Sequence, residues 1–226
     1  LDTGVTFDRY VIDQSVSNVC PVGMQHVSGD MLQDDSDLGS IQELQSSTCM
    51  KWIGPFINGR PIYPERCIEF NEQKWKFLSQ KLSTKSIDVC IDTYEYPNQL
   101  GQSPLVSITY TESKKMCEAQ NKRLCTEDEW TFACEGPEAL PYPYGYKRDK
   151  TTCNIDKSWR AFSEKKLNKR GSETQRDEIS RLWQGEPSGF REECVSVFGV
   201  QDMTGNIDEW TSSTKPSKFV SILKGG

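Results

Sequence analysis

Alternation between apolar and polar positions indicates where this chain forms strands. The segment from Asp88 to Tyr96 alternates and is rich in β-branched and aromatic residues, so it predicts a strand that ends at Pro97. A shorter strand is expected from Met24 to Val27, after a turn that begins at Cys20. The segment from Val106 to Tyr110 predicts a short strand or an extended stretch.

The pattern also predicts two short helices. Thr111 is the expected N-cap of the first, which runs to about Gln120 with Met116 and Ala119 on its inner side. The second begins at the capping box Thr126-Glu127-Asp128-Glu129, in which the threonine hydroxyl accepts the N3 amide and the last glutamate reaches back to the cap.

From Gly136 onward the chain is interrupted repeatedly by glycine and proline, and periodic signals become sparse. The same stretch is rich in aromatic side chains, which bury large areas when they pack. They are Tyr142, Tyr144, Tyr146, Trp159, Trp183, Phe190, Phe198 and Trp210. We therefore expect packed loops that need disulfides or a metal to hold them. The fold class predicted is α+β with little regular structure, two short helices and many packed loops.

A change in pattern near residue 87 suggests two parts. Residues 1–87 include an irregular stretch rich in proline and glycine between Gly54 and Pro64, and they end in a polar segment, Ser83 to Ser86, expected to be a linker. Residues 88–226 contain the main regular patterns. We predict a cysteine-containing N-terminal region at 1–87, with its packing on the main domain left open, and a main domain at 88–226.

Charge and hydropathy exclude two kinds of partner. With 27 Lys and Arg against 33 Asp and Glu, the net charge is -6, so the chain has no general attraction for nucleic acid. No apolar run is long enough to cross a bilayer. The chain starts at Leu1 and stops after Lys224-Gly225-Gly226, in what reads as a strand, so we expect a processed or truncated product without its signal peptide or lipid anchor.

The nine cysteines are scattered along the chain without a Cys-x-x-Cys pair. This density favours disulfides and an oxidising compartment over buried thiols, and the odd number leaves one thiol free or paired elsewhere. Cys125 and Cys134 would lie about 13 Å apart on the second helix, too far to bridge, which leaves Cys117 as a candidate partner for one of them. The sequence has no Asn-x-Ser/Thr acceptor, which favours a bacterial source.

The segment from Phe198 to Trp210 is the best candidate for chemistry. Asp202 and Glu209 flank a Gly-Asn turn, and in an extended backbone the carbonyls of Gly205 and Ile207 point the same way as the Glu209 side chain. Mixed carboxylate and carbonyl oxygens are the ligands that calcium prefers. The alternative is a turn in which Asp202 caps local amides and Glu209 faces water.

Other sites are less well supported. His26 is the only histidine, so a catalytic triad or a histidine metal site would need it, yet no motif surrounds it. The cysteine spacings fit no compact zinc site. The acidic stretch at Asp34, Asp35 and Asp37 lacks the glycine and closing glutamate of an EF-hand, and it predicts a solvated loop.

Five ordered segments resemble the formylglycine-generating-enzyme family, also called sulfatase-modifying factors. They cover about residues 88–226 and not residues 1–87. The segments are Cys90 to Asn98, Lys122 to Trp130, Tyr142 to Gly145 with Asn154-Ile155, Phe198 to Trp210, and Leu223 to Gly226. Cys125 stands where the family has proline, and Asp208 where it has tryptophan.

This resemblance implies a C-type-lectin-like fold, often with bound calcium. Carried over by position, one calcium site would use the side chains of Asp202 and Glu209 and the carbonyls of Gly205 and Ile207. A second would use the Asn154 side chain and the Ile155 carbonyl. The family's enzymes oxidise a substrate cysteine with copper and a cysteine pair beyond the Gly-Gly that ends this chain, and none of the nine cysteines occupies that position.

Three functions follow as hypotheses. The first is a non-catalytic binding or structural module, secreted, periplasmic or surface-attached at the cell envelope, stabilised by calcium and disulfides, with a protein, peptide or glycan ligand. Its contact candidates are the loops Tyr142 to Tyr146 and Trp183 to Phe190, for which core packing is the alternative. The second is a copper-dependent formylglycine-generating oxidase whose cysteine pair lies beyond residue 226. The third, based on fold analogy, is a carbohydrate-binding lectin.

Overall fold

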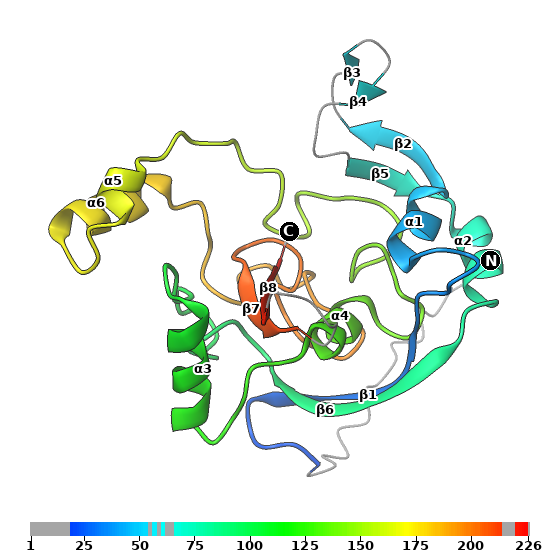
Figure 1. Ribbon diagram of the computed structural model, residues 1–226, viewed down its shortest axis with the longest axis horizontal. Coiled ribbons are helices and arrows are strands. Elements are labelled where there is room, and N and C mark those ends of the chain that lie inside the picture. The colour runs from blue at the N-terminus through cyan, green and yellow to red at the C-terminus, as the bar shows by residue number, and fades with distance from the viewer. Residues whose placement is uncertain (1–18, 54–55, 58–59, 62–65, 214–219, 226) are drawn as a thin grey trace, which may run out of the picture.

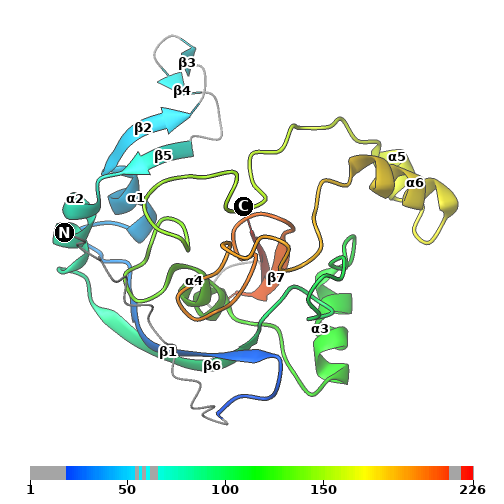
Figure 2. The ribbon, with the colours of Figure 1, turned by 180° about the vertical axis from the view of Figure 1, so that it is seen from behind.

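Two strands that lie 60 residues apart in the sequence form the longest sheet of this computed structural model. Strands β1 (Met24–Leu32) and β6 (Thr84–Asp92) pair antiparallel along their full lengths, from Met24 opposite Asp92 to Leu32 opposite Thr84. The structure describes residues 19–53, 56–57, 60–61, 66–213 and 220–225. In Figures 1 and 2 this ribbon curves beneath helix α4.

The remaining elements are short. The strands are β2 (Cys49–Ile53), β3 (Phe56–Ile57), β4 (Arg60–Pro61), β5 (Arg66–Phe70), β7 (Glu209–Ser212) and β8 (Ser221–Lys224). They form three further two-stranded antiparallel sheets, β2 with β5, β3 with β4, and β7 with β8. The helices are α1 (Ile41–Ser46), α2 (Glu72–Ser79), α3 (Tyr110–Ala119), α4 (Glu127–Glu135), α5 (Glu164–Leu167) and α6 (Glu173–Leu182). The predicted α+β fold with packed loops is confirmed.

The main core joins the long sheet to α4 and to the loop before β7. Val27, Ile87 and Ile91 from the sheet pack against Trp130 and Phe132 of α4. The N-terminal part of the chain therefore contributes directly to the core that supports the C-terminal loops. A second core surrounds Trp75, which is fully buried and donates its indole N–H to the Glu138 carbonyl at 2.9 Å.

Both predicted helices exist, with one shift at a helix start. The capping box at Thr126 and Glu129 is present, and Arg123 adds two contacts of 2.7 Å to the Glu129 carboxylate. The first helix is capped by Thr109 and not by Thr111, because Glu112 reaches back to the Thr109 amide and so forms its own capping box. The segment 106–110, predicted to be a short strand or an extended stretch, forms no strand: Ser107 has φ of 61°, and Tyr110 already lies in α3.

The strand prediction near residue 88 was displaced towards the N-terminus. Ser83 to Ser86, expected to be a linker, leads into β6 instead, and β6 ends at Asp92 rather than Tyr96. The chain leaves the sheet because the Asn98 side chain accepts the Tyr94 amide at 3.0 Å and closes a turn. The division between residues 87 and 88 stays a prediction, and it would cut β6. Of the stretch from 54 to 64 only 56–57 and 60–61 are described, and Gly226 lies outside the described residues.

Three disulfides confirm the prediction of oxidised cysteines. Cys20 pairs with Cys90 and Cys49 with Cys67, and Cys153 pairs with Cys194 across the loops that precede β7. Cys117, Cys125 and Cys134 are free, so the predicted lack of a bridge between Cys125 and Cys134 is confirmed, and the candidate pairing of Cys117 with one of them is not present.

Candidate functional site

Asp202 lies at the centre of the loop that the sequence analysis singled out. Its backbone adopts a left-handed conformation with φ of 57°, and its amide donates to the Cys194 carbonyl at 2.9 Å. Its carboxylate accepts the Gly189 amide at 2.6 Å, and the residue is 6% exposed. Burial raises the pKa of this carboxyl. The alternative interpretation has Asp202 capping local amides, but the amide that it accepts is that of Gly189, 13 residues earlier, and this contact uses one carboxylate oxygen.

The turn after Asp202 passes very close to a second loop. Gly205 has φ of 87°, and a Cβ at this position would lie 2.6 Å from the Asn154 carbonyl oxygen, so only glycine fits here. The next amide, that of Asn206, donates to the same carbonyl at 3.2 Å. The Asn206 side chain also accepts from the Asn154 amide group at 2.9 Å. The two candidate calcium sites therefore lie next to each other and share a hydrogen-bond network.

Glu209 begins β7 and points into the protein, not into water as the alternative interpretation proposed. Its carboxylate accepts the Trp130 indole N–H at 2.6 Å. Burial raises the pKa of Glu209, and the negative charge of Asp202 raises it further.

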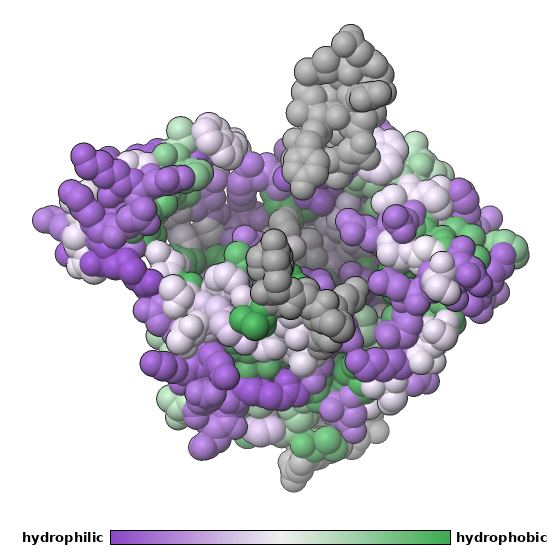
Figure 3. Space-filling view, in the orientation of Figure 1, coloured by the Kyte–Doolittle hydropathy of each residue, from purple (hydrophilic) through white to green (hydrophobic). Residues whose placement is uncertain are grey.

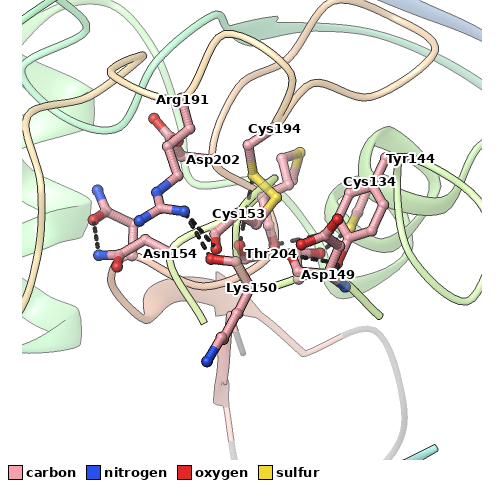
Figure 4. Close-up of a disulfide and its surroundings, with 12 residues drawn as sticks. Cys134, Tyr144, Asp149, Lys150, Cys153, Asn154, Arg191, Cys194, Asp202 and Thr204 are labelled. Atoms are coloured by element: carbon pink, nitrogen blue, oxygen red, sulfur yellow. Dashed lines mark hydrogen bonds between the residues drawn. A yellow bond between two sulfur atoms is a disulfide. The ribbon is translucent and has the colours of Figure 1, made fainter. Parts of the chain in front are cut away.

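Asn154 and Ile155 follow the Cys153–Cys194 disulfide, which Figure 4 shows beside Asn154, Arg191 and Asp202. Arg191 fastens this loop by donating to the carbonyls of Lys150, Thr151 and Cys153 at 2.8 to 3.2 Å. The Asn154 side-chain nitrogen is fully used, but its Oδ1 is buried and accepts no hydrogen bond from the described residues. A buried oxygen without a donor is costly unless something binds it.

This donor chemistry fits calcium. Buried carboxyls with raised pKa, an unsatisfied amide oxygen and a tight turn with two carbonyls together offer the mixed oxygen ligands that calcium takes. Among the described residues no three His, Cys, Asp or Glu side chains form a group that could hold a metal. A calcium ion here would therefore depend on carbonyl and amide oxygens as much as on carboxylates.

Glu95 is a member of this network that the sequence analysis did not assign to the site. It follows β6 and is 3% exposed. Burial raises the pKa of Glu95 to about 8, and repulsion from Glu209 and Asp202 adds to the effect. In the sequence, Glu95 belongs to the predicted strand and to a segment that resembles the family, but no short-range pattern joins residue 95 to a loop more than 100 residues further on.

A large groove lies beside this network, and the sequence analysis missed it. It encloses about 1230 Å³ between α3, α6 and β7. Met116 and Cys117 of α3 line one side, Ile179 and Leu182 of α6 line the other, and Trp210 of β7 lies between them. The hydrophobic spacing on α6 could have suggested a buried face, but nothing in the sequence says which element faces it.

One exposed ion pair ties the two sides of the groove together. Arg170, in the turn between α5 and α6, donates to both oxygens of Glu112 on α3 at 2.8 and 3.0 Å. Inside the hairpin the buried Glu178 carboxylate accepts from Arg181 at 2.6 Å and from the Ser163 amide at 2.9 Å. Figure 3 shows that the outer surface of this hairpin is mostly hydrophilic.

The groups considered for nucleophilic chemistry lie in unsuitable environments. Burial raises the pKa of the free thiols Cys125 and Cys134 to about 12, so both stay protonated and weakly nucleophilic at neutral pH. Cys117 also has a pKa raised by burial. His26 lies on β1 and pairs with Asp88 at 2.7 Å on the exposed side of the sheet.

The aromatic loops proposed as contact surfaces fall into two groups. Tyr142 is 7% exposed, stacks on Tyr144 and donates to the Cys67 carbonyl at 2.5 Å, so it belongs to the interior. Trp183 lines the groove, whereas Phe190 is 68% exposed outside it.

The acidic loop at Asp34 to Asp37 is a local turn, since the Asp35 carboxylate accepts the amides of Asp37 and Leu38, both at 2.8 Å.

The fold and the site define a class of protein, a loop-rich α+β domain held by disulfides, with a buried oxygen-lined network beside an apolar groove. The chain belongs to the family of the sulfatase-modifying factor enzyme 1-like domain, whose profile matches residues 55–226. Within the described part of the chain, none of the helices has the length and apolar character needed to span a membrane.

Two similar curated proteins are each named inactive Cα-formylglycine-generating enzyme 2. The one from Bos taurus is 29% identical over 125 residues, which are 49% of this chain and 33% of that protein. The one from Mus musculus is 28% identical over 139 residues, 54% of this chain and 36% of that protein. The matched segments thus span about a third of the length of these relatives.

Proposed function

We propose that this chain is an extracytoplasmic, non-catalytic binding module that uses calcium and disulfides to hold its loops and takes up a peptide segment of a partner protein in the groove between α3 and α6. An envelope or secreted protein is the setting that fits this proposal. The observation that carries it is the groove, because it is large, mostly apolar and open to solvent beside a network that stabilises its floor.

Calcium would serve the floor of the groove. Asp202 and Glu209 would supply carboxylates, and Gly205 and Ile207 would supply carbonyls. Asn154, with its unsatisfied Oδ1, and the Ile155 carbonyl would serve a second ion. Residues 136–208 contain only two short helices, so few backbone hydrogen bonds of regular structure hold these loops. A bound ion would stabilise the loops by joining their oxygen atoms.

Three observations support a non-catalytic role. The free thiols near the groove have pKa values raised by burial, which disfavours the thiolate. The single histidine lies at the sheet surface. The relatives carry the word inactive in their names.

The three disulfides fit an oxidising compartment outside the cytoplasm.

Calcium dependence can be tested by thermal unfolding with and without a chelator. We expect chelation to lower the melting temperature of the wild type and to leave Glu209→Ala unaffected. Identical melting curves for the wild type with calcium and with chelator would reject the calcium part of the proposal.

Peptide binding can be tested by selecting displayed random peptides on the full chain and measuring their affinity for two variants. Ile179→Lys places a charge in the groove, whereas Ser180→Lys places the same charge on the exposed side of α6. We expect the first to abolish binding and the second to leave it unchanged. Equal binding to both variants would place the ligand elsewhere, and binding of glycans in place of peptides would favour a lectin.

A further inference from the structure

The geometry points to Glu95 as the positioning residue of the proposed calcium site, holding the Asn206–Ile207 turn so that the turn's carbonyls and the Asn154 side chain are directed for metal binding. This inference rests on the proposed function. It assigns to Glu95 no contact with the metal itself.

Glu95 contacts the turn through both of its carboxylate oxygens. Oε2 accepts the Asn206 side-chain N–H at 2.7 Å, and Oε1 lies 3.3 Å from the Ile207 amide nitrogen that donates to it. Ser188, which is fully buried, donates its hydroxyl to Oε2 at 3.0 Å. One carboxylate therefore contacts two successive residues and holds the peptide group between Asn206 and Ile207, which lies between the two carbonyls proposed as ligands, those of Gly205 and Ile207.

The same contact reaches the second candidate site through Asn206. While its Nδ2 donates to Glu95, its Oδ1 accepts from the Asn154 Nδ2 at 2.9 Å and from the Glu186 amide at 2.8 Å. Because Nδ2 of Asn154 donates to Asn206, the other atom of the Asn154 side-chain amide, Oδ1, faces away from Asn206 and has no donor among the described residues. Glu95 thus acts together with the Gln184 carbonyl, which accepts from Asn154 Nδ2 at 3.0 Å, in leaving Oδ1 as the atom of Asn154 that is available as a ligand.

The position of Glu95 is itself well determined. It lies in the turn that ends β6, where the Asn98 amide donates to the Glu95 carbonyl at 2.8 Å and the Asn98 side chain accepts the Tyr94 amide at 3.0 Å. Because β6 belongs to the main core, the carboxylate is attached to the most regular part of the fold. A rigid strand end that holds an irregular turn is the arrangement expected of a residue that orients metal ligands.

Only a carboxylate can make this set of contacts. Two of the three partners are N–H groups that can only donate, so the NH₂ group of a glutamine would oppose either the Ile207 amide or the Asn206 side-chain amide. Among the described residues no salt bridge joins Glu95 or Glu209 to a cation, Arg191 acts on Asp202 at longer range, and burial raises the pKa of all three carboxyls. A cation bound by the neighbouring ligands would favour the ionised carboxylates that burial otherwise disfavours.

Terbium luminescence tests the inference on the full chain. The Trp130 indole touches the Glu209 carboxylate, so it can transfer excitation to a terbium ion bound there, and calcium affinity follows from displacement of terbium. Glu95→Gln should weaken calcium binding by about 10- to 100-fold, as is usual when a residue that orients metal ligands is removed. Ser188→Ala, a milder change that removes one donor to Glu95, should weaken binding by a smaller factor.

Glu178→Gln is the matched control. Glu178 is also a buried carboxylate that accepts several hydrogen bonds, but it lies in the α5–α6 hairpin and contacts neither calcium loop. The variant Glu178→Gln should have a lower free energy of unfolding than the wild type and a calcium affinity within twofold of it. A role of Glu95 in stability alone would instead lower the melting temperature of Glu95→Gln without changing the affinity of the folded fraction, and that result would overturn the inference.

The outcomes also separate this inference from the proposed function. If the wild type does not bind terbium, the calcium proposal fails. If the wild type binds and both Glu95→Gln and Ser188→Ala bind equally well, only the role of Glu95 fails. If Glu95→Gln does not fold, Ser188→Ala decides, and an affinity equal to that of the wild type refutes the role.

Discussion

Removal of the Cys153–Cys194 disulfide should affect both the stability of this protein and the candidate calcium loops. The bridge closes the segment that carries the α5–α6 hairpin, and both cysteines are nearly inaccessible to solvent. Cys194 also accepts the Asp202 amide through its carbonyl, and Cys153 directly precedes Asn154. In the double variant Cys153→Ala/Cys194→Ala, residues from both candidate sites lose a covalent anchor.

The magnitude follows from the loop that the bridge closes. Its cysteines are 41 residues apart, and loop-closure entropy for that length gives about 4 kcal/mol at 25 °C. The cysteines of the Cys49–Cys67 bridge are 18 residues apart, which gives about 3 kcal/mol. The double variants that lack one or the other bridge should therefore lose similar free energies of unfolding. A difference between them in calcium response would then reflect which bridge lies next to the calcium loops.

The assay is denaturant unfolding of the wild type and both double variants, each with calcium and with chelator. We expect calcium to stabilise the wild type and Cys49→Ala/Cys67→Ala by similar amounts and to stabilise Cys153→Ala/Cys194→Ala much less. If Cys153→Ala/Cys194→Ala loses under 1 kcal/mol, the bridge does not hold these loops. If its calcium response equals that of Cys49→Ala/Cys67→Ala, the bridge does not organise the site.

Three further predictions concern other parts of the molecule. Thr126→Ala should cost about 1 kcal/mol in urea unfolding, since it removes the hydroxyl that caps α4, and an unchanged midpoint would contradict the capping box. In chelator, the free energy of unfolding should fall as pH rises from about 4.5 to about 8, because burial raises the pKa of Glu95 to about 8. Between these pH values the folded chain keeps a proton on Glu95 that the unfolded chain has released. The melting temperature of Glu95→Gln should therefore vary less over this range. Arg170→Ala should speed hydrogen exchange in α6 while changing global stability by less than about 1 kcal/mol, since the exposed pair with Glu112 is a contact that joins the hairpin to α3. Unchanged exchange would show that other contacts hold the hairpin.

Local signals in the sequence predicted the local structure well. The capping box at Thr126 is complete within four residues, so the start of α4 was predicted correctly. The start of α3 was placed two residues late because Thr109 and Thr111 are both acceptable caps, and only the reach of Glu112 distinguishes them. The extent of β1 was underestimated because Gly29 and Asp30 interrupt its apolar pattern. Pairing with β6 extends the strand to Leu32, and such pairing is a long-range property.

The candidate site shows the same division between short-range and long-range information. Asp202, Gly205, Ile207 and Glu209 lie within eight residues of one another, so their spacing alone suggested a calcium loop. The partner that orients this loop, Glu95, lies more than 100 residues earlier, and its burial depends on how β6 packs. Ligand atoms supplied by a turn can be predicted from the turn, whereas the groups that orient them come from whichever element the fold brings near. A family resemblance therefore suggests candidate ligands more readily than it suggests the residues that would orient them, and the Glu95 variants test that second set directly.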